Sequence, residues 1–233
     1  MLFNKEKKTP LILMIFAVVT IILWQIPGGY WILYPFTILG TWFHEMGHGL
    51  TALMLGGDFQ YLEIYSNGSG LAVHSGDVFL GGFGRAIVAA GGPLGPTIAG
   101  SFFIAVSKNP KIAKIILLIL GVILLLSVLI WIRSLFGVIF IVLFGFLILF
   151  IALRMRDEIK TLTLQLLGVQ ACVSVYLSIG YLFSTGASVG GASYMSDTAV
   201  MQDALFLPYW FWGALIIIFS LFLIYKSIKY AYK

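Results

Sequence analysis

Charged residues are scarce in this chain of 233 residues: 10% of positions are Asp, Glu, Lys or Arg, and 61% are hydrophobic. A soluble globular domain carries about 25% charged residues, so the composition excludes an ordinary soluble domain. Cysteine is almost absent, and Cys172 cannot form an intramolecular disulfide because it is alone. Its apolar surroundings predict a small buried core residue and not a metal ligand.

Basic residues outnumber acidic ones by 14 to 9, but they cluster at the ends of apolar runs. In those places they would contact lipid headgroups, so the expected partner is the bilayer and not nucleic acid. Several apolar runs are near or above the roughly 18 residues that a membrane span needs. We therefore predict an all-α polytopic membrane protein, an integral multi-pass chain with a single domain over residues 1–233.

The apolar runs predict about seven transmembrane helices, at residues 10–26, 30–56, 85–106, 112–132, 134–153, 161–183 and 209–225. The third run holds two prolines and three glycines within residues 91–96. This predicts either loosened backbone that lines a cavity or a kink with only a packing role. Between the second and third runs, residues 57–84 alternate loosely around a turn signal at residues 67–70. They predict a small membrane-associated β-hairpin whose edge could receive an extended peptide.

Histidine is also rare, yet two of the three histidines stand four residues apart in His44-Glu45-Met46-Gly47-His48, inside the second apolar run. On a helix these positions share one face, so both imidazoles can bind one zinc ion. Glu45 would lie beside the open coordination position, where it can take a proton from water. Ionisable residues inside a span are costly, which favours a functional motif over a chance match in a core helix.

A hydrolytic zinc site needs a third protein ligand, and the residues alone leave its identity open. The candidates are His74, Asp58, Glu63, Asp77, Asp197 and Asp203. With seven spans, the segment before the last span lies on the same side of the membrane as the hairpin. His48 is about two helical turns from that side, so both segments are within reach of it. Ser196 is expected to cap a short helix that ends near Phe206.

The chain resembles the site-2 protease family of intramembrane zinc metalloproteases, specifically its compact bacterial branch without a PDZ domain. The resemblance rests on His44–His48 in a span, the hairpin after it, Gly92-Pro93 in the next span and Ser196-Asp197 before a late span. It implies Zn²⁺ as the cofactor and Asp197 as the third ligand, with Asp203 as the alternative. The chain departs from better-known members in the residues around its aspartate.

A second departure is an asparagine that those members carry in the Gly-Pro span and this chain lacks, Thr97 being the nearest polar residue. The resemblance implies a metalloendopeptidase of the bacterial cell membrane. It would hydrolyse peptide bonds in or near transmembrane segments of other membrane proteins, with Glu45 as catalytic base, as in regulated intramembrane proteolysis. The hairpin edge and the third span would hold the substrate extended.

Two other functions are considered: a catalytically inactive metal-binding membrane scaffold or regulator, and a transporter. A general base directly after the first ligand favours the enzyme, and no broken-helix repeat in two halves supports transport. Orientation receives opposite indications. An N-terminus inside places five of the 14 basic residues at the cytoplasmic face, Lys5, Lys7, Lys8, Arg85 and Arg133, so the positive-inside rule favours the reverse. The resemblance implies an active site near the cytoplasmic face, and hence an N-terminus inside.

Overall fold

The computed structural model describes residues 5–232, and the side chains of residues 11–231, so those of Lys5, Lys7 and Lys8 lie outside the described part. The helices are α1 (Lys5–Gln25), α2 (Gly29–Met54), α3 (Gly82–Val106), α4 (Pro110–Ile130), α5 (Leu135–Arg154), α6 (Asp157–Leu177), α7 (Ile179–Leu182), α8 (Asp197–Leu205) and α9 (Tyr209–Tyr232). Two antiparallel hairpins join them, β1 (Asp58–Ile64) with β2 (Gly70–Ser75) and β3 (Gly186–Val189) with β4 (Ala192–Met195). The predicted class, a helical membrane protein with a small hairpin after the second helix, is confirmed.

Five helices of the described chain are long and apolar enough to cross a membrane singly: α3, α4, α5, α6 and α9. The expected first two spans, α1 and α2, pass the same test only as a pair and are bent by 117° relative to each other. The bend lies at Pro27-Gly28-Gly29, where Gly28 has a φ of 83°, a conformation that glycine adopts without strain. The described residues therefore contain five candidate spans, or six if the bent pair counts as one, close to the predicted number.

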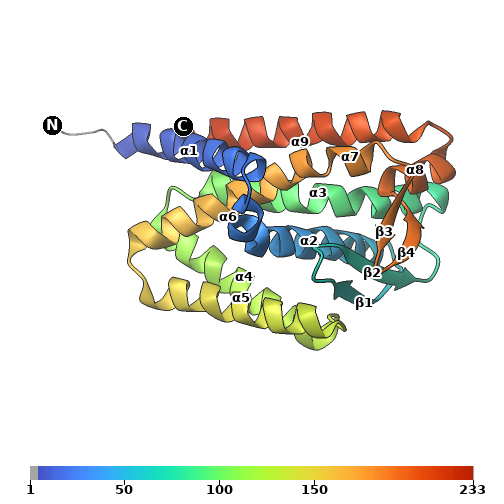
Figure 1. The fold of residues 1–233 in the computed structure, drawn as a ribbon, viewed down its shortest axis with the longest axis horizontal. Helices are drawn as coiled ribbons and strands as arrows, with labels where there is room; N and C mark the ends of the chain where they lie inside the picture. Colours follow the sequence, from blue (N-terminus) through green and yellow to red (C-terminus); the bar gives the residue numbers. More distant parts are fainter. Residues whose placement is uncertain (1–4, 233) are drawn as a thin grey trace.

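Helix α3 occupies the centre of the molecule and packs against α2, α6, α8 and α9 (Figure 1). It continues through Pro93 and Pro96 without a break, so the predicted loosening of this span is wrong. Neighbouring helices can satisfy the backbone groups that a proline frees in a membrane helix. The glycines bring α2 close instead, because a Cβ added at Gly95 would lie 2.5 Å from the Phe43 carbonyl oxygen.

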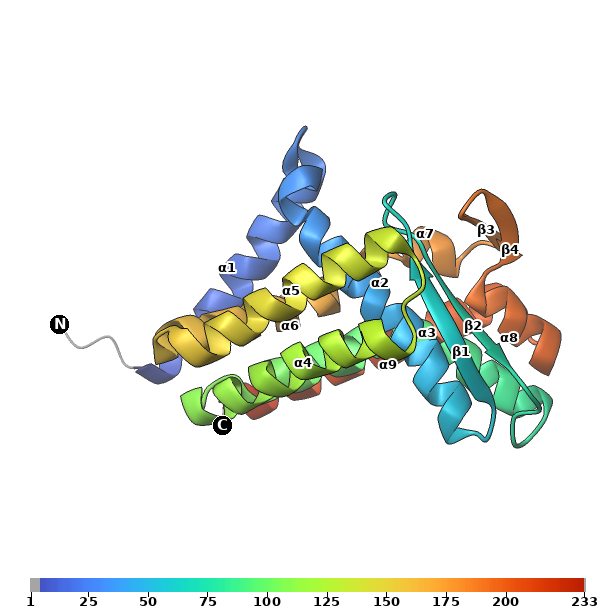
Figure 2. The ribbon, with the colours of Figure 1, turned by 90° about the horizontal axis from the view of Figure 1, so that it is seen from below.

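The β1–β2 hairpin lies along the second half of α2, at the end of the molecule opposite to the start of α1 and the end of α9 (Figures 1 and 2). The α4–α5 connection covers the outer edge of β1, since Leu62 exchanges backbone hydrogen bonds with Trp131 and Arg133 at 2.9 and 3.0 Å. Thr41 ties the turn to α2 by donating to the Gly68 carbonyl at 2.6 Å. Among the described residues, no backbone hydrogen bond pairs the opposite edge of β2.

The segment before α9 contains the predicted short helix, α8, and a hairpin that was not predicted, β3–β4. Helix α8 ends at Leu205, and Ser196 is its N-cap, accepting a hydrogen bond from the Ala199 amide at 3.2 Å. The β3–β4 hairpin was not predicted from a segment that is rich in glycine and serine. Its signal is Gly190-Gly191, a two-residue turn in which both glycines have positive φ angles, 57° and 87°.

Candidate metal centre

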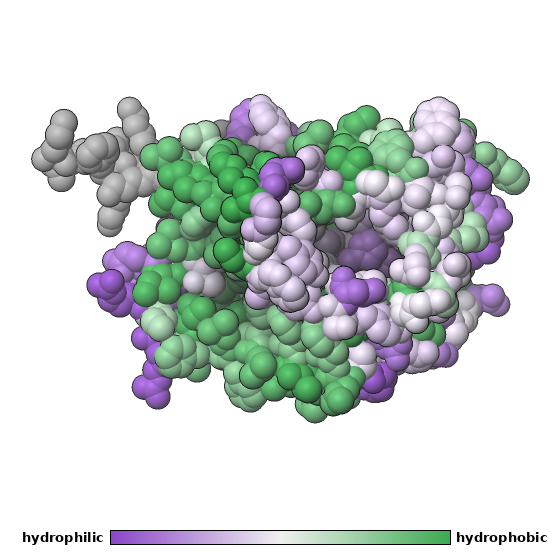
Figure 3. Space-filling model, in the orientation of Figure 1, coloured by the Kyte–Doolittle hydropathy of each residue, from purple (hydrophilic) through white to green (hydrophobic). Residues whose placement is uncertain are grey.

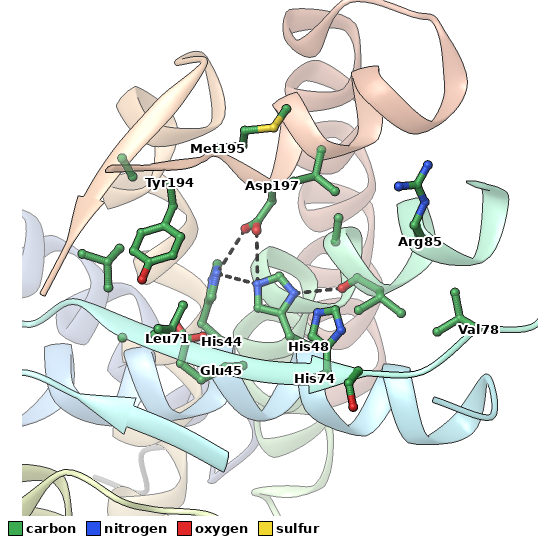
Figure 4. Close-up of a pocket in the computed structure, with 18 of the residues that line it drawn as sticks. His44, Glu45, His48, Leu71, His74, Val78, Arg85, Tyr194, Met195 and Asp197 are labelled. Carbon is green, nitrogen blue, oxygen red and sulfur yellow. Dashed lines mark hydrogen bonds and ion pairs between the residues drawn. The ribbon is translucent and has the colours of Figure 1, made fainter. Parts of the chain in front are cut away.

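The two motif histidines project from one face of α2, as their spacing predicts (Figure 4). His48 is only 9% exposed, and its Nδ1 lies 2.9 Å from the Val88 carbonyl oxygen of α3. Because a carbonyl oxygen can only accept, Nδ1 carries the proton and the Nε2 lone pair is free. That Nε2 lies 3.2 Å from Nε2 of His44. Helix α3 thus orients a nitrogen of His48 for coordination, which is how metal-binding histidines are commonly held.

Asp197 is the first residue of α8, and four hydrogen bonds fix this turn. Ser196 caps the helix and also donates to the Ser184 carbonyl. Thr198 donates to the Leu182 carbonyl at 2.9 Å, and the Asp197 amide donates to the Tyr181 hydroxyl at 3.0 Å. These hydrogen bonds therefore connect the segment before β3 to the segment after β4. This closure places the Asp197 carboxylate above α2.

The Asp197 carboxylate reaches both histidines: Oδ2 lies 3.1 Å from His44 Nε2 and Oδ1 lies 3.2 Å from His48 Nε2 (Figure 4). A tetrahedral ion with bonds of about 2.0–2.1 Å, the length typical of zinc with histidine, separates its ligands by about 3.3 Å. The observed separations fit that spacing. Oδ2 of Asp197 is also buried, and among the described residues it has the ion-pair contact with His44 but no hydrogen bond of good geometry, so a cation between them would satisfy both atoms. The three side chains can hold a metal ion.

Glu45 lies between this group and the β1–β2 hairpin. Its side chain is 6% exposed. A Cβ added at Gly70, the first residue of β2, would lie 2.7 Å from Glu45 Cγ and 2.8 Å from Oε1. The carboxyl group therefore packs against β2 at Gly70, where the absence of a side chain makes room for it.

The structure places the other candidates for the third ligand outside the group of three. Asp58, Asp77 and Asp203 are exposed, and Asp203 lies farther along α8. Glu63 accepts a hydrogen bond from Tyr65, which raises the pKa of Tyr65 to about 12. His74 projects from β2 near the site, and partial burial lowers its pKa (Figure 4).

Two other predictions concern residues away from the three side chains. Thr97 faces α9, where it donates to Ser220 at 3.3 Å, and not the site. Cys172 is buried within α6, as its apolar surroundings predict.

Two cavities, of about 360 and 370 Å³, meet at the group. The first runs past β2 and the start of α3 to β4, and the second runs between α2 and α6. Both are lined by His44, Glu45, Gly70, Tyr181, Ala187 and Val189. Hydrophobic residues predominate over the long helices, whereas hydrophilic residues gather around the hairpins and at the bottom of a hollow there (Figure 3).

Sequence reasoning missed two cavity residues, Tyr181 and Arg85. Neither stands in a motif. Tyr181 follows a break between α6 and α7, and Arg85 lies in the first turn of α3. Their places beside the site depend on tertiary packing, so no local pattern could have indicated them.

Replacing Gly92 with alanine is expected to weaken metal binding about 10- to 100-fold. A Cβ at this position would overlap the imidazole of His48, which cannot turn aside without breaking its hydrogen bond to Val88. Zinc affinity measured by competition with a chelating dye checks this. Gly40→Ala on α2 is the matched control, because its Cβ would meet only Ser174 Cβ at 3.6 Å. Equal affinities in the two variants would contradict the proposed close approach.

The chain was compared with known proteins at the levels of family, sequence and structure. No curated protein and no solved structure matches it significantly. The model of one family, described as Peptidase M50B-like, matches residues 12–227. That range includes the histidine motif, both hairpins, Asp197 and most of α9. Since the match covers almost the whole chain, this protein belongs to the Peptidase M50B-like family, within the site-2 protease family.

Proposed function

We propose that this protein is an intramembrane zinc metallopeptidase that hydrolyses peptide bonds in or near transmembrane segments of other membrane proteins. It would act in the bacterial cell membrane, in the manner of regulated intramembrane proteolysis. One observation carries the proposal. A carboxylate about 150 residues downstream of the motif reaches 3.1–3.2 Å from both histidine nitrogens, with Glu45 adjacent in the same cavity. Two histidines, one carboxylate and an open side form the ligand set of hydrolytic zinc sites.

In the proposed reaction His44, His48 and Asp197 hold the ion, and Glu45 moves the proton. A zinc ion bound there would supply Lewis acidity, making a water molecule more acidic and a peptide carbonyl more electrophilic. The Glu45 carboxylate accepts a proton from the attacking water while the oxygen of that water bonds to the carbonyl carbon. It then gives that proton to the amide nitrogen as the C–N bond breaks, so the products are a carboxylate and an amine.

The proposed substrate is a transmembrane protein within the same bilayer. Its helix must unwind locally before hydrolysis, because every helical carbonyl is already hydrogen-bonded. The unpaired edge of β2 offers backbone groups to an extended segment and lies directly over Glu45. The β3 strand lines the same cavity through Ala187 and Val189. An extended segment between β2 and β3 would therefore bring its peptide bond to the metal centre.

Removal of the metal is expected to abolish cleavage. The full chain, purified in lipid nanodiscs with zinc, should cut a fluorescently labelled single-span protein within or next to its span, as mapped by mass spectrometry. A chelator such as phenanthroline should stop cleavage, and added zinc should restore it. Its non-chelating isomer is the control for solvent effects. Zinc binding without cleavage of any single-span protein would instead favour the non-enzymatic scaffold or regulator.

A further inference from the structure

Tyr181 stands at the junction of the two cavities and is neither one of the proposed ligands nor the proposed base. It belongs to the four-residue helix α7, which follows a break in the chain after α6. Its ring meets the His44 ring edge-on, with centroids 6.2 Å apart and planes at 70°. It lines both cavities, as His44 and Glu45 do. The phenol therefore lies beside the proposed ligands, on the open side of the group.

The hydroxyl of Tyr181 has one hydrogen-bonding capacity in use and another free. It accepts a hydrogen bond from the Asp197 amide at 3.0 Å. A phenol also has one O–H donor, and within residues 11–231 it makes no hydrogen bond of good geometry, only a weak contact with the Asp197 carboxylate. The Asp197 amide holds the oxygen next to the metal centre. The proton remains available to an acceptor that enters the cavity.

Hydrolysis of a peptide bond creates such an acceptor. Negative charge develops on the carbonyl oxygen as water attacks, and a donor already positioned for that oxygen lowers the barrier. His44, His48 and Asp197 are the proposed ligands, and Glu45 is the proposed base. Arg85 and Tyr194 also line the first cavity, but both side chains are exposed. Tyr181 is a neutral hydrogen-bond donor in that cavity, and the backbone amide of Asp197, a proposed ligand, holds its hydroxyl in place.

We propose that Tyr181 is a catalytic residue that donates its O–H to the oxygen of the scissile carbonyl as charge develops there. The donation strengthens from the bound substrate to the transition state, because a negatively charged oxygen is the better acceptor. This inference rests on the proposed peptidase function and assigns a second stabilising group to the same reaction. It requires no change in the protonation state of Tyr181.

The test replaces Tyr181 with phenylalanine in the zinc-loaded full chain. We expect kcat to fall about 100-fold, the effect typical of losing one such donor, while KM and zinc content stay unchanged. Affinity for a phosphinic peptide, whose tetrahedral anion mimics the transition state, should fall by the same factor as kcat/KM. Tyr176→Phe is the matched control, since Tyr176 lies five residues earlier and is 54% exposed.

The possible failures are distinguishable. If the wild-type protein cleaves no single-span protein, the peptidase function and the role of Tyr181 are both overturned. If the wild type cleaves and Tyr181→Phe has the same kcat, only the role of Tyr181 is overturned. Loss of zinc from Tyr181→Phe would also overturn it, because the phenol would then act by holding Asp197. A raised KM with unchanged kcat would likewise show that Tyr181 contributes to substrate binding alone.

Discussion

Glu45→Gln is expected to lower kcat about 10³- to 10⁴-fold while the protein still binds one zinc ion. Glutamine has nearly the same size and shape as glutamate, so it fits the space beneath Gly70 that the carboxyl group occupies. It lacks a basic oxygen, and general acid–base catalysis by a positioned side chain contributes about 10²- to 10⁴-fold. The same residue serves twice in the proposed reaction, first as base and then as acid. The expected loss is therefore at the upper end of this range.

The measurement combines two readouts on one preparation. Initial rates with a single-span substrate give kcat and KM, and metal analysis gives the zinc content. Glu158→Gln is the matched control, because Glu158 is exposed in the first turn of α6, far along the chain from the motif. Full activity in the control and near-zero activity in Glu45→Gln would assign the loss to one carboxylate.

A different outcome would reassign the base and not merely weaken the proposal. His74 lines the same cavity, and its lowered pKa favours the neutral imidazole, a form that accepts protons. If Glu45→Gln cleaves normally while His74→Gln is inactive with its zinc retained, the base is His74. Glu45 is the stronger candidate because it lies in the same helical turn as His44 and His48, which keeps it in place relative to the ion.

The local part of the site was predictable from the sequence, and the distant part was not. Two histidines at i and i+4 share a face on any helix, so α2 had only to be helical for His44 and His48 to meet. Asp197 offers the same chemistry as Asp203, six residues later. What separates them is the capped start of α8 and the closure of the β3–β4 hairpin, which are tertiary features. Only the resemblance favoured Asp197 beforehand.

The fold shows the same division between local and tertiary information. The apolar runs predicted the bounds of α4 and α5 to within a few residues, because both sequences are apolar over the full length of a membrane span. Hydropathy carries no information on the angle between α1 and α2 at Pro27-Gly28-Gly29. The structure therefore has a bent pair of helices where two separate spans were predicted. In α3, the glycines and prolines indicated loosened backbone or a kink from composition alone. The packing of α2 against those glycines shows why the helix persists and why the residues are small.

Asp197→Ala is expected to lower zinc affinity by more than about 100-fold, whereas Asp203→Ala should leave it unchanged. Loss of a coordinating residue should exceed the 10- to 100-fold effect typical of losing a group that merely orients a ligand. Asp197 is 7% exposed, and its carboxylate bridges the two imidazoles. It is the anionic member of the group, so its removal takes away a bond and the charge that offsets the cation. Asp203 belongs to the same short helix but is exposed.

The two variants form a matched pair, because both remove an aspartate from α8 and leave the helix length unchanged. Zinc content after dialysis and affinity against a chelating dye give the result, and circular dichroism confirms that both variants remain folded. Zinc lost only from Asp203→Ala would move the third ligand to Asp203 and require α8 to turn. Zinc retained by both would leave two histidines without a carboxylate partner and would contradict the proposed ligand set. The expected pattern, zinc lost from Asp197→Ala alone, would assign the third ligand to the aspartate that lies beside the two α2 histidines in the described part of the chain.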